Sequence, residues 1–328
     1  MDNNNLTLII KALVAIALGC GGVIAIFYGL NILVEKALPE RIRLKVLPWI
    51  YIGPSLLLLG LYLVIPTLRT LYLSFFNANS TRFVGFENYL FALSAPDMLI
   101  AFRNNILWLV LVTGISVGLG LIIAVLVDRV KYEPLAKSLI FLPMAISFVG
   151  ASVIWRFIYA YRPEGAAQIG LLNAIVTGLG FEPVGWLVDR GINNFALIAI
   201  MIWLQTGFCM VLLSSAVKGV PKDVIEAARV DGASEVQIFR RIIVPMIMPT
   251  ITVVATTTVV LVLKVFDIVF VMTGGNLDTD VIASRMVKEM FNFRHFGRGS
   301  AIAVILLLAV IPVMVANIRR FRQQEMSR

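Results

Sequence analysis

The stretch EAARVDGASEVQIFRRIIVPMIMP, residues 226–249, is a polar segment between two long apolar runs, and it decides how the chain is organised. Gly232 lies near its start, and glycine readily takes the left-handed backbone conformation that ends a helix. Ser234 is followed three residues later by Gln237, which is the spacing of a capping box that starts a helix. The sequence therefore predicts two short helices joined by a sharp elbow at Gly232.

The second arm of this elbow has an apolar side. Val236, Phe239 and Ile243 recur at helical spacing, and the two arginines between them face elsewhere. The pattern predicts an apolar ridge with a charged rim, which fits a groove on a partner. Glu226 is expected to pair with Arg229 one turn on, or with a basic residue of that partner. The plainer interpretation is a solvated loop with ordinary helix caps.

Seven apolar runs surround the elbow. The chain has 328 residues, of which 59% are hydrophobic and 14% charged, far more apolar than an ordinary soluble domain. A helix needs about 20 apolar residues to cross a bilayer. Runs of that length lie at 8–34, 47–73, 104–127, 137–161, 194–217, 247–272 and 299–318. The predicted fold class is all-α, a polytopic membrane protein with about seven transmembrane helices.

The distribution of positive charge orients these helices. Sixteen Lys and Arg residues fall in the C-terminal tail and in the loops on the elbow's side, and ten fall in the opposite loops and helix ends. Loops rich in Lys and Arg stay in the cytoplasm. The elbow and the C-terminus are thus predicted to be cytoplasmic, and the N-terminus to lie outside. The net charge of +9 is spread over short loops, so nucleic-acid binding is not expected.

The elbow resembles the EAA loop of the permease subunits of binding-protein-dependent ABC importers, where this loop docks onto a cytoplasmic ATPase. The stretch VFDIVFVMTGG, residues 265–275, resembles the sugar-permease branch of the maltose and α-glucoside type. The resemblance covers roughly residues 47–318. The ATPase-coupling residues that it implies are Glu226, Ala227, Ala228, Gly232, Phe239, Ile242 and Pro245.

The resemblance also implies an organisation and a set of partners. The chain would be a type I ABC importer permease in a bacterial inner membrane, with an extra N-terminal transmembrane helix and cytoplasmic loop at 1–46. The permease domain would span 47–318, with the coupling loop at 218–249, and a short basic cytoplasmic tail would follow at 319–328. The implied partners are a second homologous permease, a cytoplasmic ATPase dimer, a periplasmic or lipid-anchored sugar-binding protein, and membrane lipid.

The sequence lacks the residues for ATP binding and for catalysis. It has no GxxxxGK[ST] phosphate-binding loop and no Gly–Lys pair. We therefore expect no cofactor in this chain and expect ATP and Mg to be bound by the partner ATPase. With one histidine the chain has no two-histidine metal site, and Asp267 is the sole carboxylate deep within an apolar run. The prediction is a transport subunit, not an enzyme, with no catalytic or metal-binding residues.

Two charged residues lie inside the apolar run 247–272. Lys264 and Asp267 are three residues apart, and an unpaired charge at mid-bilayer costs about 2.5 to 3.5 kcal/mol, so they should pair or face water. They either hydrogen-bond a polyhydroxyl substrate along a translocation path or form an ion pair between helices. An alternative function follows, a secondary transporter or channel with Lys264 and Asp267 as an ion relay. A membrane scaffold whose elbow recruits a soluble protein is a third hypothesis.

The preceding apolar run carries aromatic rings beside an amide. Trp203, Gln205 and Phe208 combine groups that stack on sugar faces with one that reads hydroxyls. The resembling sugar permeases place substrate contacts on these two helices, so the predicted substrate pathway is Trp203, Gln205, Phe208, Lys264 and Asp267. The plainer interpretation is helix packing. The predicted substrate is an α-glucoside or similar small glycoside, delivered by the binding protein to the outer loops 162–193 and 273–298.

Overall fold

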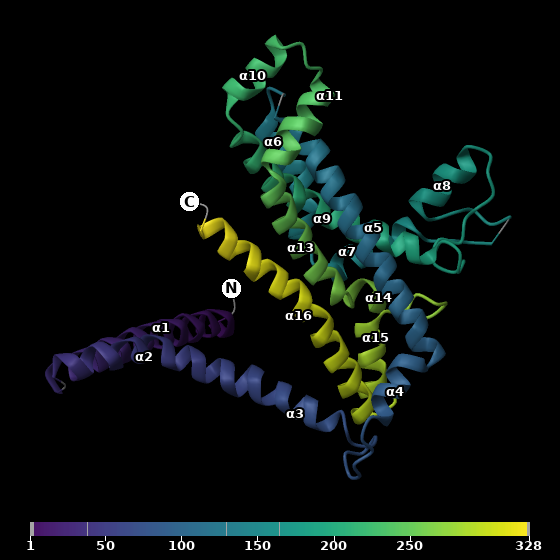
Figure 1. Ribbon diagram of the computed structural model, residues 1–328. Coiled ribbons are helices and arrows are strands. Elements are labelled where there is room, and N and C mark those ends of the chain that lie inside the picture. The colour runs from purple at the N-terminus through teal and green to yellow at the C-terminus, as the bar shows by residue number, and fades with distance from the viewer. Residues whose placement is uncertain (1–2, 38, 129, 164, 327–328) are drawn as a thin grey trace. The chain divides into compact units, whose positions relative to one another are not determined.

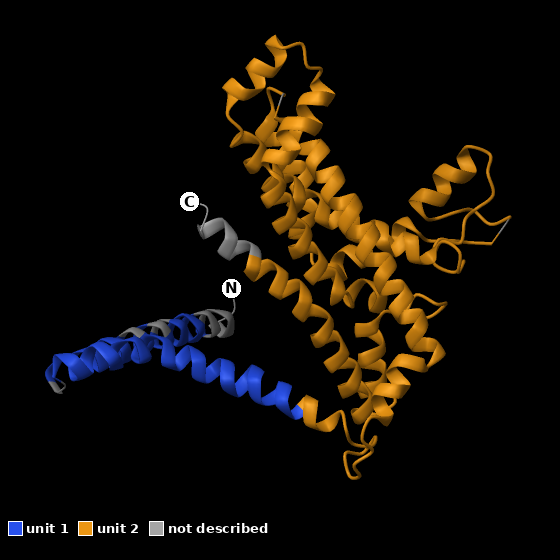
Figure 2. Cartoon of the chain, viewed as in Figure 1, with its two compact units in different colours: residues 1–69 blue, residues 70–328 orange. Residues whose placement is uncertain are grey.

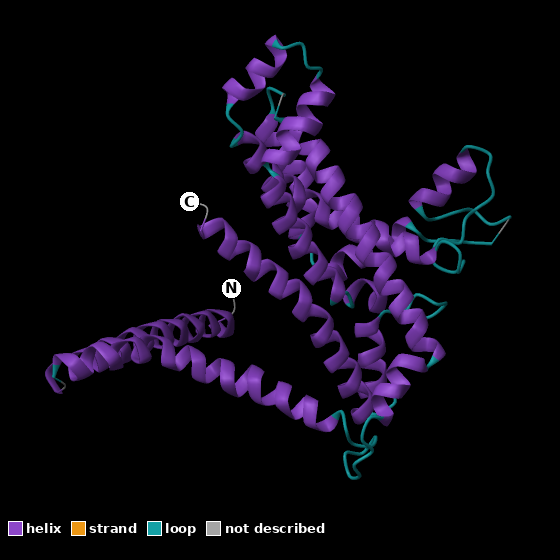
Figure 3. Cartoon of the chain, in the orientation of Figure 1, coloured by secondary structure: helices purple, strands orange, loops and turns teal. Residues whose placement is uncertain are grey.

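The computed structural model describes residues 3–37, 39–128, 130–163 and 165–326. Within these residues the chain consists of helices and loops, without a strand, and one isolated bridge joins Phe76 to Phe83 (Figure 3). The chain divides into two compact units, 1–69 and 70–328 (Figure 2). The predicted boundary at residue 46, between the extra N-terminal helix and the permease domain, stays a prediction. Of the predicted basic tail, the last two residues and the side chains beyond Arg319 lie outside the described part.

The first unit consists of two long apolar helices that contact each other. Its elements are α1 (Asn3–Ala37), α2 (Glu40–Leu59), the π-helix η1 (Gly60–Val64) and most of α3 (Ile65–Leu73). The last three run on as one continuous helix (Figure 1). Phe27 of α1 stacks on Tyr51 of α2, with ring centroids 5.8 Å apart. Both helices are long and apolar enough to cross a membrane.

The second unit holds the remaining helices. They are α4 (Glu87–Ser94), α5 (Pro96–Val127), α6 (Glu133–Phe141), η2 (Leu142–Ala145), α7 (Phe148–Ile158), α8 (Leu171–Gly178), α9 (Asn193–Lys218), α10 (Lys222–Val230), α11 (Glu235–Ile238), η3 (Phe239–Ile243), α12 (Val244–Met246), α13 (Met248–Leu263), α14 (Asp267–Met272), α15 (Ile282–Val287), η4 (Lys288–Asn292) and α16 (Phe296–Met326).

The core of this unit is the pair α5 and α9, which pack along each other (Figure 1). Gly120 makes the close approach possible, because a Cβ atom there would lie 2.6 Å from the Cβ of Cys209. Trp108 is fully buried in the same interface, and its indole Nε1 donates a hydrogen bond to Asn194 Oδ1 at 2.7 Å. α6, α13 and α14 pack around this pair. The core thereby fixes the helices that carry the candidate site.

Two of the predicted spans are bent. α6 and η2 meet α7 at 98°, where Pro143 lies in the 3₁₀ turn and the Ser147 hydroxyl caps α7 by accepting from Gly150 N at 3.0 Å. The arm 235–246 meets α13 at 72°. Five helices in the described residues are long and apolar enough to span a membrane, or up to seven if each bent pair is one span. The all-α polytopic fold is confirmed, and the apolar run at 137–161 is a bent pair of helices.

Candidate coupling and translocation site

The elbow has the local structure that its sequence predicts. α10 ends at Val230, and Gly232 has a φ of +79°, the left-handed conformation. Ser234 then caps α11, because its side chain accepts from the backbone N–H of Gln237 at 3.4 Å. The Gln237 side chain in turn accepts from the backbone N–H of Ser234 at 2.8 Å, which completes the capping box. The turn between the two arms is therefore closed by interactions within a few residues.

An ion pair ties the two arms together across the elbow. Arg229 Nε lies 2.9 Å from Glu235 Oε1, and this hydrogen bond raises the pKa of the Arg229 guanidinium. The expected pair between Glu226 and Arg229 is not formed. Both members of the observed pair are about half exposed, so solvent screens much of their attraction.

The apolar ridge predicted on the second arm was wrong in part. Val236 is exposed and Phe239 half-buried, but Ile243 is buried together with Ile238. The reason is the π-helix η3, which inserts one extra residue per turn and brings residues five apart, Ile238 and Ile243, to the same inner side. These two pack in one buried cluster with Val217. The second arm is thus anchored to the core by Ile238 and by Ile243, the one ridge residue that turns inward.

The predicted coupling residues fall on both sides of the elbow. Glu226, Ala227, Gly232 and Pro245 are exposed. Ala228 and Ile242 pack against the buried cluster beneath. Glu226 also lines a hollow of about 560 Å³ between the elbow and the inner ends of α5 and α9. The exposed part of the elbow is the surface that a partner can reach.

The membrane-embedded site lies where the run 247–272 breaks. α13 ends at Leu263 and α14 begins at Asp267, so the run is not one helix. Asp267 and Gln205 of α9 line a cavity of about 350 Å³ together with Ser147, the cap of α7. Gln205 is 4% exposed, and its amide makes no hydrogen bond within the described residues. Within the described residues the side chains of Gln205 and Asp267 have no hydrogen-bond partner, so the cavity that they line can hydrogen-bond a ligand.

Lys264 lies beside this cavity and not in it. It is exposed, and with Asp267 it lines a smaller adjoining cavity of about 30 Å³. No ion pair joins Lys264 to Asp267 in the described residues, so the expected interhelical lock is not formed by these two. Beyond the first turn of α13, the exposed residue is Thr257. Lys264, the residue directly after α13, follows it by seven positions, which places it on the same face. In α16 the exposed positions between residues 307 and 318 are apolar instead, among them Leu308 and Ile311.

The two predicted aromatic contacts lie in packing positions. Trp203 meets Trp155 edge to face, with centroids 5.7 Å apart, and packs on the main core. Phe208 packs on a second cluster around Cys209. Neither lines the cavity, and their role in the substrate pathway stays a prediction. Ser147 was missed, although Pro143 and the capping hydroxyl are signals of the bend that brings it there.

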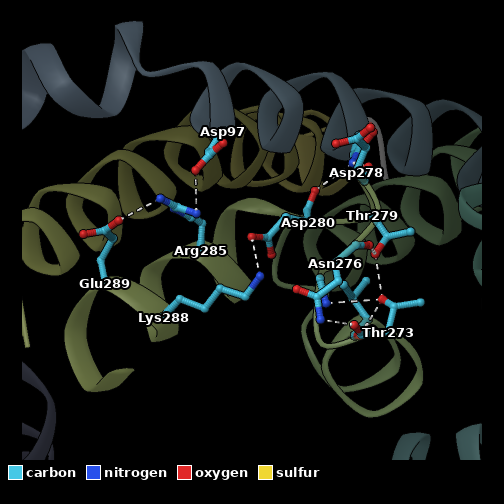
Figure 4. A network of polar contacts seen from close by, with 12 residues as sticks. Asp97, Thr273, Asn276, Asp278, Thr279, Asp280, Arg285, Lys288 and Glu289 are labelled. Carbon is cyan, nitrogen blue, oxygen red and sulfur yellow. Dashed lines mark hydrogen bonds and ion pairs between the residues drawn. The ribbon is translucent and has the colours of Figure 1, made fainter. Parts of the chain in front are cut away.

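The loop after α14 is held by a network of polar contacts (Figure 4). Lys288 Nζ lies 2.8 Å from Asp280 Oδ2, and both side chains are largely buried. Gly275 packs against this pair, because a Cβ atom there would lie 2.3 Å from Asp280 Oδ1. Arg285 pairs with Asp97 and Glu289, each at 3.0 Å. These contacts hold the segment 273–289 in place, and this segment is called the platform. The sequence did not predict it.

Comparisons with known proteins show the family to which the chain is similar. Residues 8–327 match the family described as binding-protein-dependent transport system inner membrane component. The chain is 73% identical to an osmoprotective compounds uptake permease of Synechocystis, over 85% of this chain and 100% of that protein. It is 46% identical to an alpha-glucoside transport system permease of Rhizobium meliloti, over 95% of this chain and 96% of that protein.

Among solved structures, the chain is similar to a bacterial ABC transporter involved in the import of the acidic polysaccharide alginate. The TM-score is 0.74 at 20% sequence identity, with 86% of this chain and 99% of that chain covered. A likeness at this identity concerns the fold.

Proposed function

The chain belongs to the inner membrane components of binding-protein-dependent transport systems, and from this premise we propose that it is the permease through which an ATP-driven importer carries a small glycoside. It is a transport subunit of an ABC transporter and not an enzyme, as its relatives are. The observation that carries the sugar assignment is the high identity, over nearly the whole chain, to an alpha-glucoside permease.

The substrate that fits best is an uncharged α-glucoside that serves as an osmoprotectant. Such a compound belongs to both classes that the two relatives are named for. The cavity supports this proposal, since its lining holds the amide of Gln205 and the carboxylate of Asp267 but no cation. A carboxylate accepts hydrogen bonds from hydroxyl groups and repels an anionic sugar. Gln205 and Asp267 would therefore read sugar hydroxyls and disfavour acidic saccharides.

The elbow is proposed to couple the cavity to a separate ATPase dimer, which would bind ATP and Mg. Closure of the two ATPase subunits would move the docked elbow, whose exposed face includes Glu226, Ala227 and Pro245. The buried Ile238 and Ile243 anchor the elbow to the core, so a rigid elbow would pass the motion into α13. α13 leads directly from the elbow arm to the break before Asp267. The movement would open the site to alternate sides of the membrane.

Further partners follow from the same proposal. A second homologous permease would face the polar stripe of Thr257 and Lys264, because polar groups exposed on a membrane helix need water or protein beside them. A periplasmic or lipid-anchored sugar-binding protein would dock on the loops 162–193 and 273–298. The elbow and the C-terminus would lie in the cytoplasm of a bacterial cell.

The test is copurification followed by transport. The tagged chain, isolated from native membranes in mild detergent, is expected to bring an ATPase and a second permease with it. Membrane vesicles holding the assembly should take up a labelled α-glucoside when ATP is inside, with uptake competed by other neutral α-glucosides and not by an acidic saccharide. Uptake that follows a proton or sodium gradient without ATP would instead support the ion-relay alternative.

A further inference from the structure

A second polar pocket lies apart from both the elbow and the cavity. It has a volume of about 130 Å³ and forms where the loop after α3 and the start of α4 meet the first turn of α16. Arg82, Glu87, His295 and Arg298 supply its charged and titratable lining. None of these residues lines the substrate cavity or belongs to the elbow, whereas His295 and Arg298 lie in the loop 273–298 that is proposed to receive the binding protein.

Close backbone contacts build this pocket. The N–H of Phe296 donates to the carbonyl oxygen of Ala78 at 3.2 Å. Gly297 packs so tightly that a Cβ atom there would lie 1.9 Å from the carbonyl oxygen of Phe76. The buried Asn88 amide donates to two carbonyl oxygens of the same loop, one of them that of Phe76 at 2.7 Å. The loop is thus fixed against α16, and the pocket is a formed feature of the fold.

The arginines of the pocket lack carboxylate partners. Within the described residues neither Arg82 nor Arg298 forms an ion pair, and Glu87 forms none either. Arg298 is held in place by the ring of Phe91, whose centroid lies 4.0 Å from the guanidinium carbon. His295 is engaged by Glu289, with Nδ1 3.0 Å from Oε2. Two guanidinium groups without an ion pair, Arg298 held over a ring and Arg82 exposed, suit an anion that accepts several hydrogen bonds, as a phosphate does.

Exposed apolar residues adjoin the lining of the pocket in sequence, and these residues are called its rim. Phe83, Phe86 and Leu90 belong to the same loop and to α4, and they are 67%, 69% and 67% exposed. Large apolar side chains at the end of a membrane helix lie at the boundary between acyl chains and headgroups. A pocket lined by the same loop and by α4 would then open at the depth of the lipid headgroups.

We propose that this pocket binds the headgroup of a phospholipid. The phosphodiester would lie between Arg82 and Arg298, and Glu87 would accept a hydrogen bond from the ammonium or hydroxyl group at the end of the headgroup. The acyl chains would run along the exposed apolar residues of the rim. A free phosphate shares the anionic chemistry but gains nothing from that rim, which is why we assign the site to a lipid.

Native mass spectrometry of the full chain from detergent tests the assignment. Phosphatidylglycerol, a neutral glycolipid and glycerol phosphate serve as the three probes. The wild-type chain should retain phosphatidylglycerol over the glycolipid, and Arg82→Gln combined with Arg298→Gln should reduce that retention by at least about tenfold. The matched control is Arg162→Gln, an exposed arginine of another loop. Arg298→Lys keeps a cation over the Phe91 ring and should retain an intermediate amount.

The outcomes separate the possible ligands. Equal retention of phosphatidylglycerol and glycolipid would overturn the proposal, as would a double variant that retains as much phospholipid as the control. Glycerol phosphate binding as strongly as the intact lipid would also overturn it, since the site would then hold a soluble anion. Unchanged lipid retention with a loss of binding-protein docking would mean that the pocket is a protein contact. A thermal unfolding midpoint equal to wild type shows that each variant is folded.

Discussion

The elbow at Gly232 and the cavity at Asp267 lie at opposite ends of α13, and they are built in different ways. The elbow is closed by contacts between neighbours in sequence, such as the capping box and the pair between Arg229 and Glu235. The cavity is lined by three separate segments, 144–149, 204–205 and 261–267. A local structure can be stiff enough to transmit force, whereas a site made by several helices changes shape when they move. The difference supports the proposal that the first region couples to the ATPase and that the second passes the substrate.

The largest expected effect breaks the elbow. Gly232→Pro cannot keep a φ of +79° and also removes the N–H that donates to the Arg229 carbonyl at 3.0 Å. The substitution costs the native elbow conformation about 3 kcal/mol or more, so the population of that conformation should fall about 100-fold. ATP-dependent uptake should fall with it. Uptake is measured in vesicles and normalised to inserted protein. Gly232→Asn is the control, because asparagine tolerates this conformation. Normal uptake by the proline variant would contradict the proposal that the elbow passes the motion of the ATPase into α13.

The next prediction distinguishes the role of a buried ion pair from that of backbone strain in the platform, residues 273–289. Gly275→Ala places a Cβ atom 2.3 Å from Asp280 Oδ1 and should disrupt the pair with Lys288. Stimulation of ATP hydrolysis by the binding protein is expected to fall about tenfold. Gly274→Ala is a matched control, with a similar φ of +61° but no heavy atom nearer than 3.4 Å. An equal loss in both variants would mean that backbone conformation, and not the buried pair, sets the platform.

A third prediction distinguishes the cavity from the packing beside it. Gln205→Leu removes an amide that faces the cavity, and the substrate concentration for half-maximal uptake should rise about tenfold. Trp203→Leu removes a ring packed on Trp155 and should lower the thermal unfolding midpoint by several degrees without changing that concentration. Transport titrations and thermal unfolding of both variants check this. The reverse pattern would move the sugar contact to the aromatic rings.

The smallest expected effect concerns the ion pair across the elbow. Arg229→Gln removes a pair whose members are 50% and 47% exposed, and such pairs contribute little in water. Uptake should change by less than about twofold, since the capping box still closes the turn. A much larger loss would indicate that Arg229 contacts the ATPase directly.

The parts of this structure that depend on residues close in sequence could be predicted from the sequence. Gly232, Ser234 and Gln237 specify the elbow because the groups that close it are near neighbours, and the apolar runs specify the helices. The inward turn of Ile243 was not readable, because a π-helix breaks the 3.6-residue spacing without a marker in the sequence. The grouping of Gln205 with Asp267 was expected from the family resemblance. The bend at Ser147 that completes their cavity depends on tertiary packing.

The most direct test of the account measures ATP hydrolysis and α-glucoside uptake together in proteoliposomes that hold the complete importer. Gly232→Pro should abolish uptake and uncouple it from ATP hydrolysis. Asp267→Asn should reduce uptake while hydrolysis still responds to the binding protein. Two variants that fail in the same way, or a proline variant that still couples hydrolysis to uptake, would contradict the division of the molecule into a coupling elbow and a substrate cavity.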